Sequence, residues 1–461
     1  MFLYQATWQL AGFTNPRFIT FMERYNPRPD NAAKQITRGR IFDAVGRELA
    51  VSDPDSPGYR NYPYGASLAH IVGYRHPLRG LTGVEGAADA LISGYIIETK
   101  EDIENVGKNA LREHRKVGSD IVITVDAELQ KFAYEQLAGR RGAVVGIDPR
   151  DGSVRVIATS PSFDPNHFEN RLNTDPASPL LNRALHGRYP PGSTFKLAIS
   201  ALAVENGVAD VLPCPAGGYY APGARRPIRD HEYYDFESKG LAWPGFGSLS
   251  LASALAKSSN TYFAQAGVTS GTDAFNRLAD SLWINARIPI YEGPSGSVSS
   301  QKGHVPKLGR GERRELAQLS IVQGRLLVTP LHLAMLTSAV ADKGRLFLPK
   351  LIETDFPREL PRPMTAATSA KVRKAMRKAV QTGTAKGADI PGLSVCGKTG
   401  TAQNPGGDSH AWFVCFAPME NPQLALAVLV ENAGYGSQNA VPVAAEVLKK
   451  AVELNYITVN Q

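Results

Sequence analysis

The sequence predicts an α+β fold, in which a mostly antiparallel sheet is flanked by helices. One observation is a hairpin: apolar runs at 142–148 and 154–160 are joined by a Pro-Arg-Asp-Gly turn. A second is a group of strand-like runs near the C-terminus whose connections are too short for crossover helices. The third is helical periodicity before and after that group. The C-terminal strands are expected at 394–400, 411–417 and 423–431, and helices at 194–202, 249–257, 316–323, 330–342, 366–380 and 440–454.

The N-terminal part of the chain has a different organisation. Polar residues at 14–37, with two Asn-Pro pairs, indicate a connector that holds one short helix at 18–24. A strand and hairpin follow from residue 38, then a helix opening with Gly83, in which Glu85 lies near the positive end of the helix dipole. A new unit starts with an alternating strand at 120–126. We therefore predict three segments, with the small domain before the large one: 1–29, 30–118 and 119–461.

Composition excludes several classes of protein. Hydrophobic residues make up 43% and charged residues 20%, which is ordinary for a folded body. The net charge of +8 favours an anionic partner such as a membrane surface, although a solvated surface explains most of it. No basic and aromatic run suggests nucleic-acid binding. Cys214, Cys396 and Cys415 have no zinc spacing, and we expect core packing rather than a Cys396–Cys415 disulfide.

Residues 1–13 are apolar and uncharged, but a membrane span needs about 20 such residues. The segment also lacks the basic start of a signal peptide. We expect it to be the end of a membrane-spanning anchor that begins upstream of this chain; a trimmed chain is the alternative.

The most informative stretch is Tyr-Pro-Pro-Gly-Ser-Thr-Phe-Lys at 189–196. The prolines cannot continue a preceding helix, Gly192 allows a tight backbone approach, and a helix-forming run follows, so Ser193 should begin a helix. Lys196 then lies one turn on, on the same face. A serine hydroxyl needs a base to become a nucleophile, and a neutral amine is such a base. Taken alone, however, Ser193 is as well explained by a helix cap and Lys196 by a solvated side chain.

Two further motifs favour the chemical interpretation. Ser258 and Asn260 form a Ser-x-Asn motif after an apolar helix, and Lys398 begins a Lys-Thr-Gly-Thr motif in a strand-like run. This three-part set is typical of β-lactamases and penicillin-binding proteins. Its chance occurrence in this order is well below roughly one in a hundred. Asn260 alone is better explained as a helix cap.

Over nearly its whole length the chain resembles class B penicillin-binding proteins, and within them the penicillin-binding protein A type of actinobacteria. The resemblance implies the transpeptidase or β-lactamase-like fold for 119–461 and a dimerisation-type pedestal for 30–118. The region before residue 118 is too short for the glycosyltransferase domain of class A enzymes. Besides the three motifs, the matching stretches are Arg-Gly-Arg-Ile-Phe-Asp at 38–43, Gly-Val-Glu at 83–85, residues 160–166 and 182–184, Gln323-Gly324, Thr329-Pro330-Leu331 and His-Ala-Trp-Phe at 410–413, with Val322 where the family often has glycine.

The resemblance implies D,D-transpeptidation of peptidoglycan stem peptides. Ser193 would attack the carbonyl between two terminal D-alanines, and an amine of a neighbouring stem would then attack the acyl-enzyme. Lys196 would be the base, with a pKa lowered by desolvation, the helix end and Lys398. Ser258 would pass the proton to the leaving amine, and Asn260 would bind the substrate amide. β-Lactams would acylate Ser193.

The same resemblance implies the binding groups. Lys398 and Thr401 would hold the terminal carboxylate, and Thr399 would complete that polar rim. Gly400 is implied as a further substrate-binding residue, on an edge strand that can pair with the peptide. The backbone N–H groups of Ser193 and Thr401 would form the oxyanion hole. No metal or cofactor is implied. The implied partners are stem peptides, β-lactams and a SEDS-family glycosyltransferase that meets the pedestal, and the implied place is the extracytoplasmic face of the plasma membrane, with a single-pass anchor.

Three alternatives stay open at this point. One is a serine β-lactamase, although we find no deacylating glutamate of the class A kind. A second is a non-catalytic β-lactam-binding scaffold or sensor, and a third is a carboxypeptidase. His231, His304 and His410 are expected to be structural or surface residues, with odds of roughly four in five.

Overall fold

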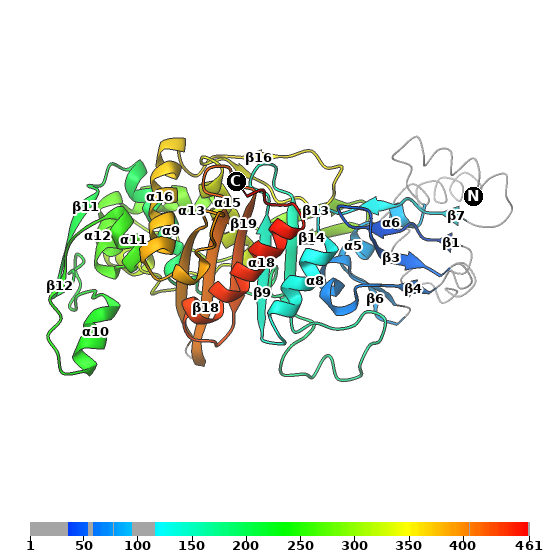
Figure 1. Ribbon diagram of the computed structural model, residues 1–461, viewed down its shortest axis with the longest axis horizontal. Coiled ribbons are helices and arrows are strands. Elements are labelled where there is room, and N and C mark those ends of the chain that lie inside the picture. Colours follow the sequence, from blue (N-terminus) through cyan, green and yellow to red (C-terminus); the bar gives the residue numbers. More distant parts are fainter. Residues whose placement is uncertain (1–35, 54–58, 77, 95–115, 405, 460–461) are drawn as a thin grey trace, which may run out of the picture.

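A computed structural model describes residues 36–53, 59–76, 78–94, 116–404 and 406–459. The expected connector helix at 18–24 and the segment 1–29 lie outside these residues. The described chain forms a small N-terminal part, here called the pedestal (residues 36–118), beside a larger body (residues 119–459) (Figure 1). No helix in the described ranges is both long enough and apolar enough to cross a membrane.

The body is built on a sheet that, within the described residues, has the strand order β10-β9-β19-β18-β17. All its neighbouring strands are antiparallel, as the short connections predicted. The predicted hairpin is the β9–β10 pair. The strands are β9 (Gly142–Ile147), β10 (Val154–Ser160), β17 (Cys396–Asn404), β18 (Gly407–Ala417) and β19 (Leu424–Val430).

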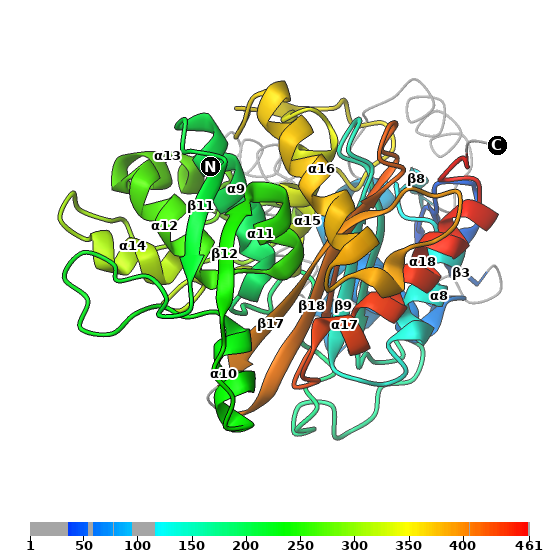
Figure 2. The ribbon, with the colours of Figure 1, turned by 60° about the vertical axis from the view of Figure 1, so that its left-hand side comes forward.

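Both faces of this sheet are buried, which explains why its strands have continuous apolar sequences. Along β19, Leu424, Leu426 and Val428 pack with one core cluster, which includes residues of α8 and α18. Ala425 and Ala427 point to the other cluster, on the side of α15. Figure 1 shows α8 and α18 lying across one face of the sheet, and Figure 2 shows the opposite side occupied by the other helices.

The remaining helices gather mainly between the hairpin and the C-terminal strands, as predicted. Residues 192–282, here called the helical lobe, lie on one side of the sheet (Figure 2). The body helices are α8 (Ala127–Gln136), η2 (Gly192–Phe195), α9 (Lys196–Glu205), α10 (His231–Ser238), α11 (Leu251–Lys257), α12 (Asn260–Ser270), α13 (Thr272–Ser281), α14 (Arg313–Ser320), α15 (Pro330–Ala341), α16 (Ala366–Thr382), η3 (Lys386–Ala388), α17 (Gly436–Asn439) and α18 (Val441–Glu453).

Short ladders complete the body, and one of them corrects a prediction. The glycine and proline residues at 213–226 predict an irregular loop, but the start of this stretch belongs to β11, which pairs with β12. The helix expected from residue 249 therefore starts later, because Ser250 ends β12 and caps α11 by accepting from the Ser253 N–H. The short strands are β11 (Val211–Pro215), β12 (Gly245–Ser250), β13 (Pro289–Gly293), β14 (Gly296–Ser299), β15 (Leu346–Phe347) and β16 (Glu359–Leu360).

The pedestal contains short strands and helical turns. The strand expected at 120–126 is reduced to β8, and it pairs in parallel with β2 of the pedestal. It ends early because the Thr124 backbone N–H bonds to the Leu351 carbonyl at 2.8 Å instead of to β2, and Asp126 caps α8. The elements are β1 (Ile36–Thr37), β2 (Ile41–Phe42), β3 (Glu48–Ser52), β4 (Arg60–Asn61), η1 (Gly65–Ser67), α4 (Ala69–Val72), β5 (Arg75–His76), β6 (Gly80–Leu81), α5 (Gly83–Ala87), α6 (Asp89–Ile92), β7 (Lys116–Val117) and β8 (Ile121–Val122).

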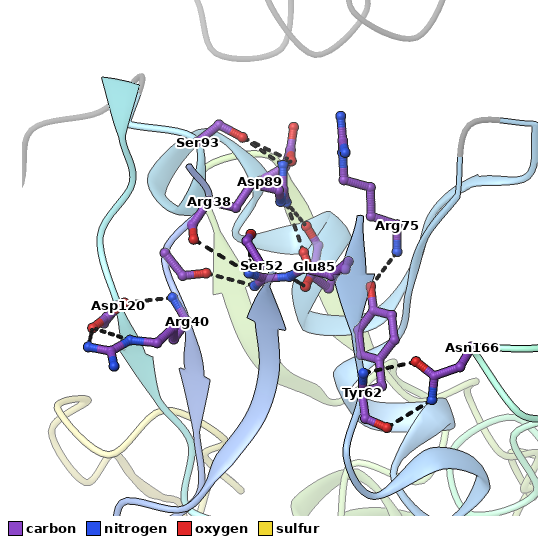
Figure 3. Close-up of polar contacts among 12 residues, drawn as sticks. Arg38, Arg40, Ser52, Tyr62, Arg75, Glu85, Asp89, Ser93, Asp120 and Asn166 are labelled. Atoms are coloured by element: carbon purple, nitrogen blue, oxygen red, sulfur yellow. Dashed lines mark hydrogen bonds and ion pairs between the residues drawn. The ribbon is translucent and has the colours of Figure 1, made fainter. Parts of the chain in front are cut away.

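A buried ionic cluster organises the pedestal (Figure 3). Glu85 is fully buried and pairs with Arg38 (2.9 Å) and with Arg60. Arg38 also pairs with Asp89 and donates to Ser93 at 2.7 Å. The sequence indicated for Glu85 only a favourable interaction with a helix dipole; its main partners are Arg60 of β4 and Arg38, which lies between β1 and β2.

Polar contacts also join the pedestal to the body. The buried carboxylate of Asp43 pairs with Arg47 (2.9 Å) and accepts a 3.1 Å hydrogen bond from the N–H that begins α8. Arg47 pairs in turn with Asp126 of the body at 3.1 Å. Further along, the Asn166 amide bonds to both backbone groups of Tyr62, at 2.9 and 3.0 Å (Figure 3).

Candidate active site

Ser193 lies in the helical turn η2, which runs directly into α9. The predicted position at the start of a helix is confirmed. Gly192 has a φ of +55°, and a Cβ there would meet the Thr401 carbonyl oxygen at 2.8 Å. Glycine is therefore required twice, for the backbone conformation and for the close approach of this turn to β17. Ser193 is partly exposed, while Lys196, one turn further on, is fully buried.

The turn that carries Ser193 is held from several sides. Trp412 of β18 donates from Nε1 to the Pro190 carbonyl at 3.0 Å. The backbone of Tyr189 exchanges two 2.9 Å hydrogen bonds with Val328, and its hydroxyl donates to Glu431 at 2.7 Å. These bonds fix the entry to the helix from the sheet and from the segment before α15.

The Lys196 ammonium connects the serine helix to the Ser-x-Asn motif. Its Nζ donates to the Ser258 carbonyl at 2.7 Å, to Asn260 Oδ1 at 2.8 Å and to Ser258 Oγ at 3.3 Å. The Phe263 ring lies 5.7 Å away. All three ammonium donors have acceptors, which a buried lysine requires.

The conformation between two helices brings the Ser-x-Asn motif to this amine. Ser258 ends α11 in the left-handed region, with φ of 59°, and Ser259 begins α12 by accepting from the Tyr262 N–H at 3.1 Å. The helix cap is therefore Ser259, not Asn260. The Asn260 side chain is freed from capping and reaches the lysine.

Lys398 approaches the same hydroxyl from the sheet. It is fully buried, and its Nζ donates to Ser258 Oγ at 3.0 Å and to the Thr399 carbonyl at 2.9 Å. The Ser258 hydroxyl thus lies between two amines, one from the helical lobe and one from β17. The three predicted motifs meet at one point.

The environment of both amines favours their neutral forms. Burial lowers the pKa of Lys196 to about 8, against the opposing effect of Asp230 and Glu232. Burial, and then the positive charge of Lys196, bring the pKa of Lys398 well below its usual value. We predicted that the charge of Lys398 lowers the pKa of Lys196; the structure shows the reverse, because the charge of Lys196 lowers the pKa of Lys398. Both shifts raise the share of neutral amine beside Ser258 near neutral pH.

The Lys-Thr-Gly-Thr motif lies on β17, which is an edge of the sheet within the described residues. Thr399 is buried and its hydroxyl bonds to Thr384, while Thr401 is exposed. A Cβ on Gly400 would meet Thr194 Cγ2 at 2.9 Å, so only glycine allows β17 this close to the serine helix. An edge strand beside a nucleophile can bind an extended peptide.

Sequence analysis missed the segment that supports the Ser-x-Asn motif. The Asp230 carboxylate accepts from Ser259 Oγ at 2.9 Å and from the Thr261 N–H at 3.0 Å. The Arg229 carbonyl accepts from Asn260 Nδ2 at 3.1 Å. These partners are about 30 residues apart in the chain. The only local signal is an aspartate before the acidic and aromatic run that becomes α10.

Among the described residues, neither the three histidines singled out above nor the cysteines contribute a further reactive group to this site. His410 is buried, and its Nδ1 accepts from the Asn432 N–H at 3.1 Å, a structural role as predicted. His231 and His304 are exposed, also as predicted. The cysteines at 214, 396 and 415 are buried free thiols, and Cys396 and Cys415 belong to the core clusters on opposite faces of the sheet.

A serine that begins a helix, a buried lysine one turn later and a hydroxyl between two amines define a serine acyl-transfer site of the penicillin-recognising kind. Residues 142–450 match the family model for the penicillin binding protein transpeptidase domain, so the chain belongs to this family of serine acyl-transfer enzymes.

Two curated relatives and one solved structure illustrate the relationship. The peptidoglycan D,D-transpeptidase PbpA of Mycolicibacterium smegmatis is 31% identical over 438 residues, covering 86% of this chain and 84% of the relative. MrdA of Acinetobacter baumannii, also a peptidoglycan D,D-transpeptidase, is 29% identical over 450 residues; the match covers 83% of this chain but 64% of that protein. The ceftriaxone acyl-enzyme of penicillin-binding protein A from M. tuberculosis superposes with a TM-score of 0.80 and 26% identity, covering 91% of this chain and 99% of that one.

Proposed function

We propose that this chain is a class B peptidoglycan D,D-transpeptidase that cross-links stem peptides through an acyl-enzyme on Ser193. The observation that carries the proposal is the Ser258 hydroxyl, which accepts hydrogen bonds from Lys196 at 3.3 Å and from Lys398 at 3.0 Å. Two buried amines on one hydroxyl form a path for a proton beside a helix that begins with a serine.

In the acylation step, neutral Lys196 takes the Ser193 proton while Oγ forms a bond to the carbonyl carbon between two D-alanines. The C–N bond then breaks, and the Ser258 hydroxyl passes a proton from Lys196 to the departing D-alanine amine. In the second step an amine of another stem attacks the ester carbonyl, loses its proton by the same path, and releases Ser193.

The oxyanion of each tetrahedral intermediate would be bound by the backbone N–H groups of Ser193 and Thr401. The contact of Gly192 with the Thr401 carbonyl supports this assignment, because it brings the two backbone segments together. Loss of one such donor costs about 3–4 kcal/mol of barrier stabilisation in comparable enzymes.

Substrate recognition would use the sheet edge and the amide of the Ser-x-Asn motif. Lys398, Thr399 and Thr401 would hold the terminal carboxylate, and the peptide backbone would extend β17. Asn260 already bonds to Lys196 and to the Arg229 carbonyl. One N–H and one lone pair of its amide remain for the substrate.

Stem peptides lie outside the plasma membrane, so we place the enzyme on the extracytoplasmic face, anchored by a single N-terminal helix that precedes this chain. The pedestal would meet a SEDS-family glycosyltransferase, a proposal supported by its place at the end of the body away from the helical lobe (Figure 1). Flotation of the full-length native protein with membranes tests the anchor; recovery only in the soluble fraction contradicts it.

The catalytic proposal is tested by incubating the protein with a penicillin and following its intact mass over hours. We expect a stable one-to-one adduct in the wild type and in Ser297→Ala, which changes an exposed serine, and none in Ser193→Ala. Rapid drug hydrolysis without a lasting adduct would instead indicate a β-lactamase. If neither adduct nor hydrolysis occurs, the chain is a non-catalytic scaffold.

A further inference from the structure

The residue immediately before α10 makes an unusual set of contacts. Asp230 is fully buried, and one of its carboxylate oxygens, Oδ1, accepts from both Ser259 Oγ (2.9 Å) and the Thr261 N–H (3.0 Å). These partners flank Asn260 on either side. One carboxylate oxygen therefore fixes both ends of the backbone that presents Asn260.

The neighbouring residue fixes the Asn260 amide itself. The Arg229 carbonyl accepts from Asn260 Nδ2 at 3.1 Å, which turns the amide so that Oδ1 faces Lys196 Nζ at 2.8 Å. A flipped amide would place its N–H₂ group against an ammonium, a pairing of two donors. Residues 229 and 230 together hold Ser259, Asn260 and Thr261 in the orientation that Lys196 needs.

The second oxygen of Asp230, Oδ2, has no hydrogen-bond partner among the described residues, although it is buried. The neighbouring Arg229 guanidinium lies over the Tyr233 ring, 3.9 Å from its centre, instead of pairing with this oxygen. The charge of Asp230 instead acts on its buried surroundings, where the titratable groups are Lys196 from α9, Cys214 from β11 and Glu232 from α10.

We propose that Asp230 is a positioning residue for the reaction, which holds Ser259 and Thr261, and with them Asn260, against Lys196 and, through its buried charge, sets the pH range in which Lys196 works as a base. The proposal rests on the role assigned to Lys196 above. It adds a function for a carboxylate that touches neither the nucleophile nor the sheet motif.

The direction of the effect follows from the charges that face Lys196. Burial lowers the pKa of Lys196, and the carboxylates of Asp230 and Glu232 oppose that effect; Lys398 faces it from β17. Removing the charge of Asp230 leaves burial less opposed, so the pKa of Lys196 falls further. The neutral amine is then present at lower pH, and the rising limb of the acylation rate moves toward acid.

Two variants separate charge from position. Asp230→Asn keeps an oxygen that can accept from Ser259 and Thr261 but loses the charge, whereas Asp230→Ala loses both. Asp235→Asn is the control, because Asp235 is an exposed acid on α10. The measurement is the second-order rate constant of penicillin acylation from about pH 5 to pH 10, a range that spans the titration of a shifted lysine.

For Asp230→Asn we expect a plateau within about threefold of wild type and a rising limb displaced to lower pH by about one unit, the size of shift a nearby buried charge produces. For Asp230→Ala we expect the plateau to fall by about tenfold or more, because small displacements of catalytic groups cost that much. Asp235→Asn should leave both unchanged. The proposal is overturned if the rising limb of the Asp230→Asn pH profile coincides with that of the wild type. It is also overturned if folded Asp230→Ala keeps the wild-type plateau rate.

Failure of this proposal is distinguishable from failure of the proposed function. If Ser193→Ala still forms the adduct, the catalytic assignment itself is wrong. If the adduct requires Ser193 but the limb of Asp230→Asn does not move, only the role of Asp230 is wrong. Should Asp230→Ala fail to fold, as judged by thermal unfolding, the pH profile of Asp230→Asn decides alone.

Discussion

Buried charges are arranged in opposite ways at two places in this molecule. In the pedestal, Glu85 lies between Arg38 and Arg60, so each charge contacts one of opposite sign. In the active site, Lys196 and Lys398 are both fully buried and share a neutral serine hydroxyl. Opposite charges in contact keep their ionised forms, whereas burial makes an amine without a counter-charge lose its proton more readily, an effect that the charge of Lys196 reinforces at Lys398. The first arrangement stabilises a fold, and the second supplies a reactive amine.

The pedestal cluster makes a prediction about stability. Glu85→Gln removes the charge shared by Arg38 and Arg60 and leaves buried guanidinium groups short of a counter-charge. Breaking a buried pair in this way costs about 3–5 kcal/mol. We expect that loss in the free energy of unfolding measured with urea. Glu48→Gln, at an exposed pair with Arg40, should cost less than about 1 kcal/mol. Equal effects of the two changes would contradict the structural role of the cluster.

The same cluster has a defined pH dependence. Burial works against ionisation of Glu85, but the charges of Arg60 and Arg38 prevail, and the pKa of Glu85 lies below its usual value. A depressed carboxyl pKa contributes stability that is complete above the unfolded pKa and is lost as pH falls through the folded one. The stability difference between wild type and Glu85→Gln should therefore be constant near neutral pH and shrink in acid. A stability difference that grows on acidification would mean that the pKa of Glu85 is raised in the folded protein, and would contradict this prediction.

At the scale of single elements, the predictions that succeeded rest on local patterns. The β9–β10 hairpin, the apolar β19 and the serine helix each carry their own turn, period or breaker residues. Those that failed depend on distant partners: β11 is a strand because β12 pairs with it, and β8 is short because Thr124 and Asp126 bond elsewhere. Asp230 escaped notice for the same reason, since its partners lie 29 and 31 residues away. Motif order predicted which residues meet; only the fold shows what holds them together.

The contact between the serine turn and β17 can be tested through glycine. Gly192→Ala places a Cβ 2.8 Å from the Thr401 carbonyl in a residue with φ of +55°, so turn and strand must separate. Gly207→Ala is a matched control, because its φ is +66° but the added Cβ meets nothing within 4 Å. We expect both to lose about 1 kcal/mol from the strained backbone. Only Gly192→Ala should slow penicillin acylation, by about 10²-fold, as expected for a displaced oxyanion donor. Equal acylation rates in the two variants would show that the close contact between the serine turn and β17 does not matter for catalysis.

On the scale of the whole molecule, the catalytic machinery and the pedestal lie at different ends of one rigid sheet. The site is assembled from the helical lobe and β17 at one edge, while α8 and the hairpin β9–β10 lie toward the pedestal (Figure 1). Polar contacts of Asp43, Arg47 and Asp126 join the two parts. The parts also share an apolar core, because Ile41 and Val84 of the pedestal belong to the same hydrophobic cluster as Ile123 of the body. A shared apolar core couples domains more firmly than polar contacts do. Asp43 is a buried acceptor at this joint, so a change there tests how much the polar contacts add to the shared core.

Asp43→Asn tests that reasoning. Asp43 Oδ1 accepts from the Arg47 N–H at 2.7 Å, which asparagine can preserve, but Oδ2 pairs with the Arg47 side chain and with the first N–H of α8, which the amide nitrogen cannot. We expect Asp43→Asn to unfold at a lower temperature than the wild type, because the Arg47 side chain and the first N–H of α8 lose a buried acceptor. Penicillin acylation of the folded protein should stay within about twofold of wild type, because sites this far apart act additively. Asp120→Asn, at an exposed pair with Arg40, should keep the wild-type unfolding profile. If Asp43→Asn unfolds at the wild-type temperature, the joint does not depend on this carboxylate; if acylation falls with the joint intact, the pedestal influences the site by another route.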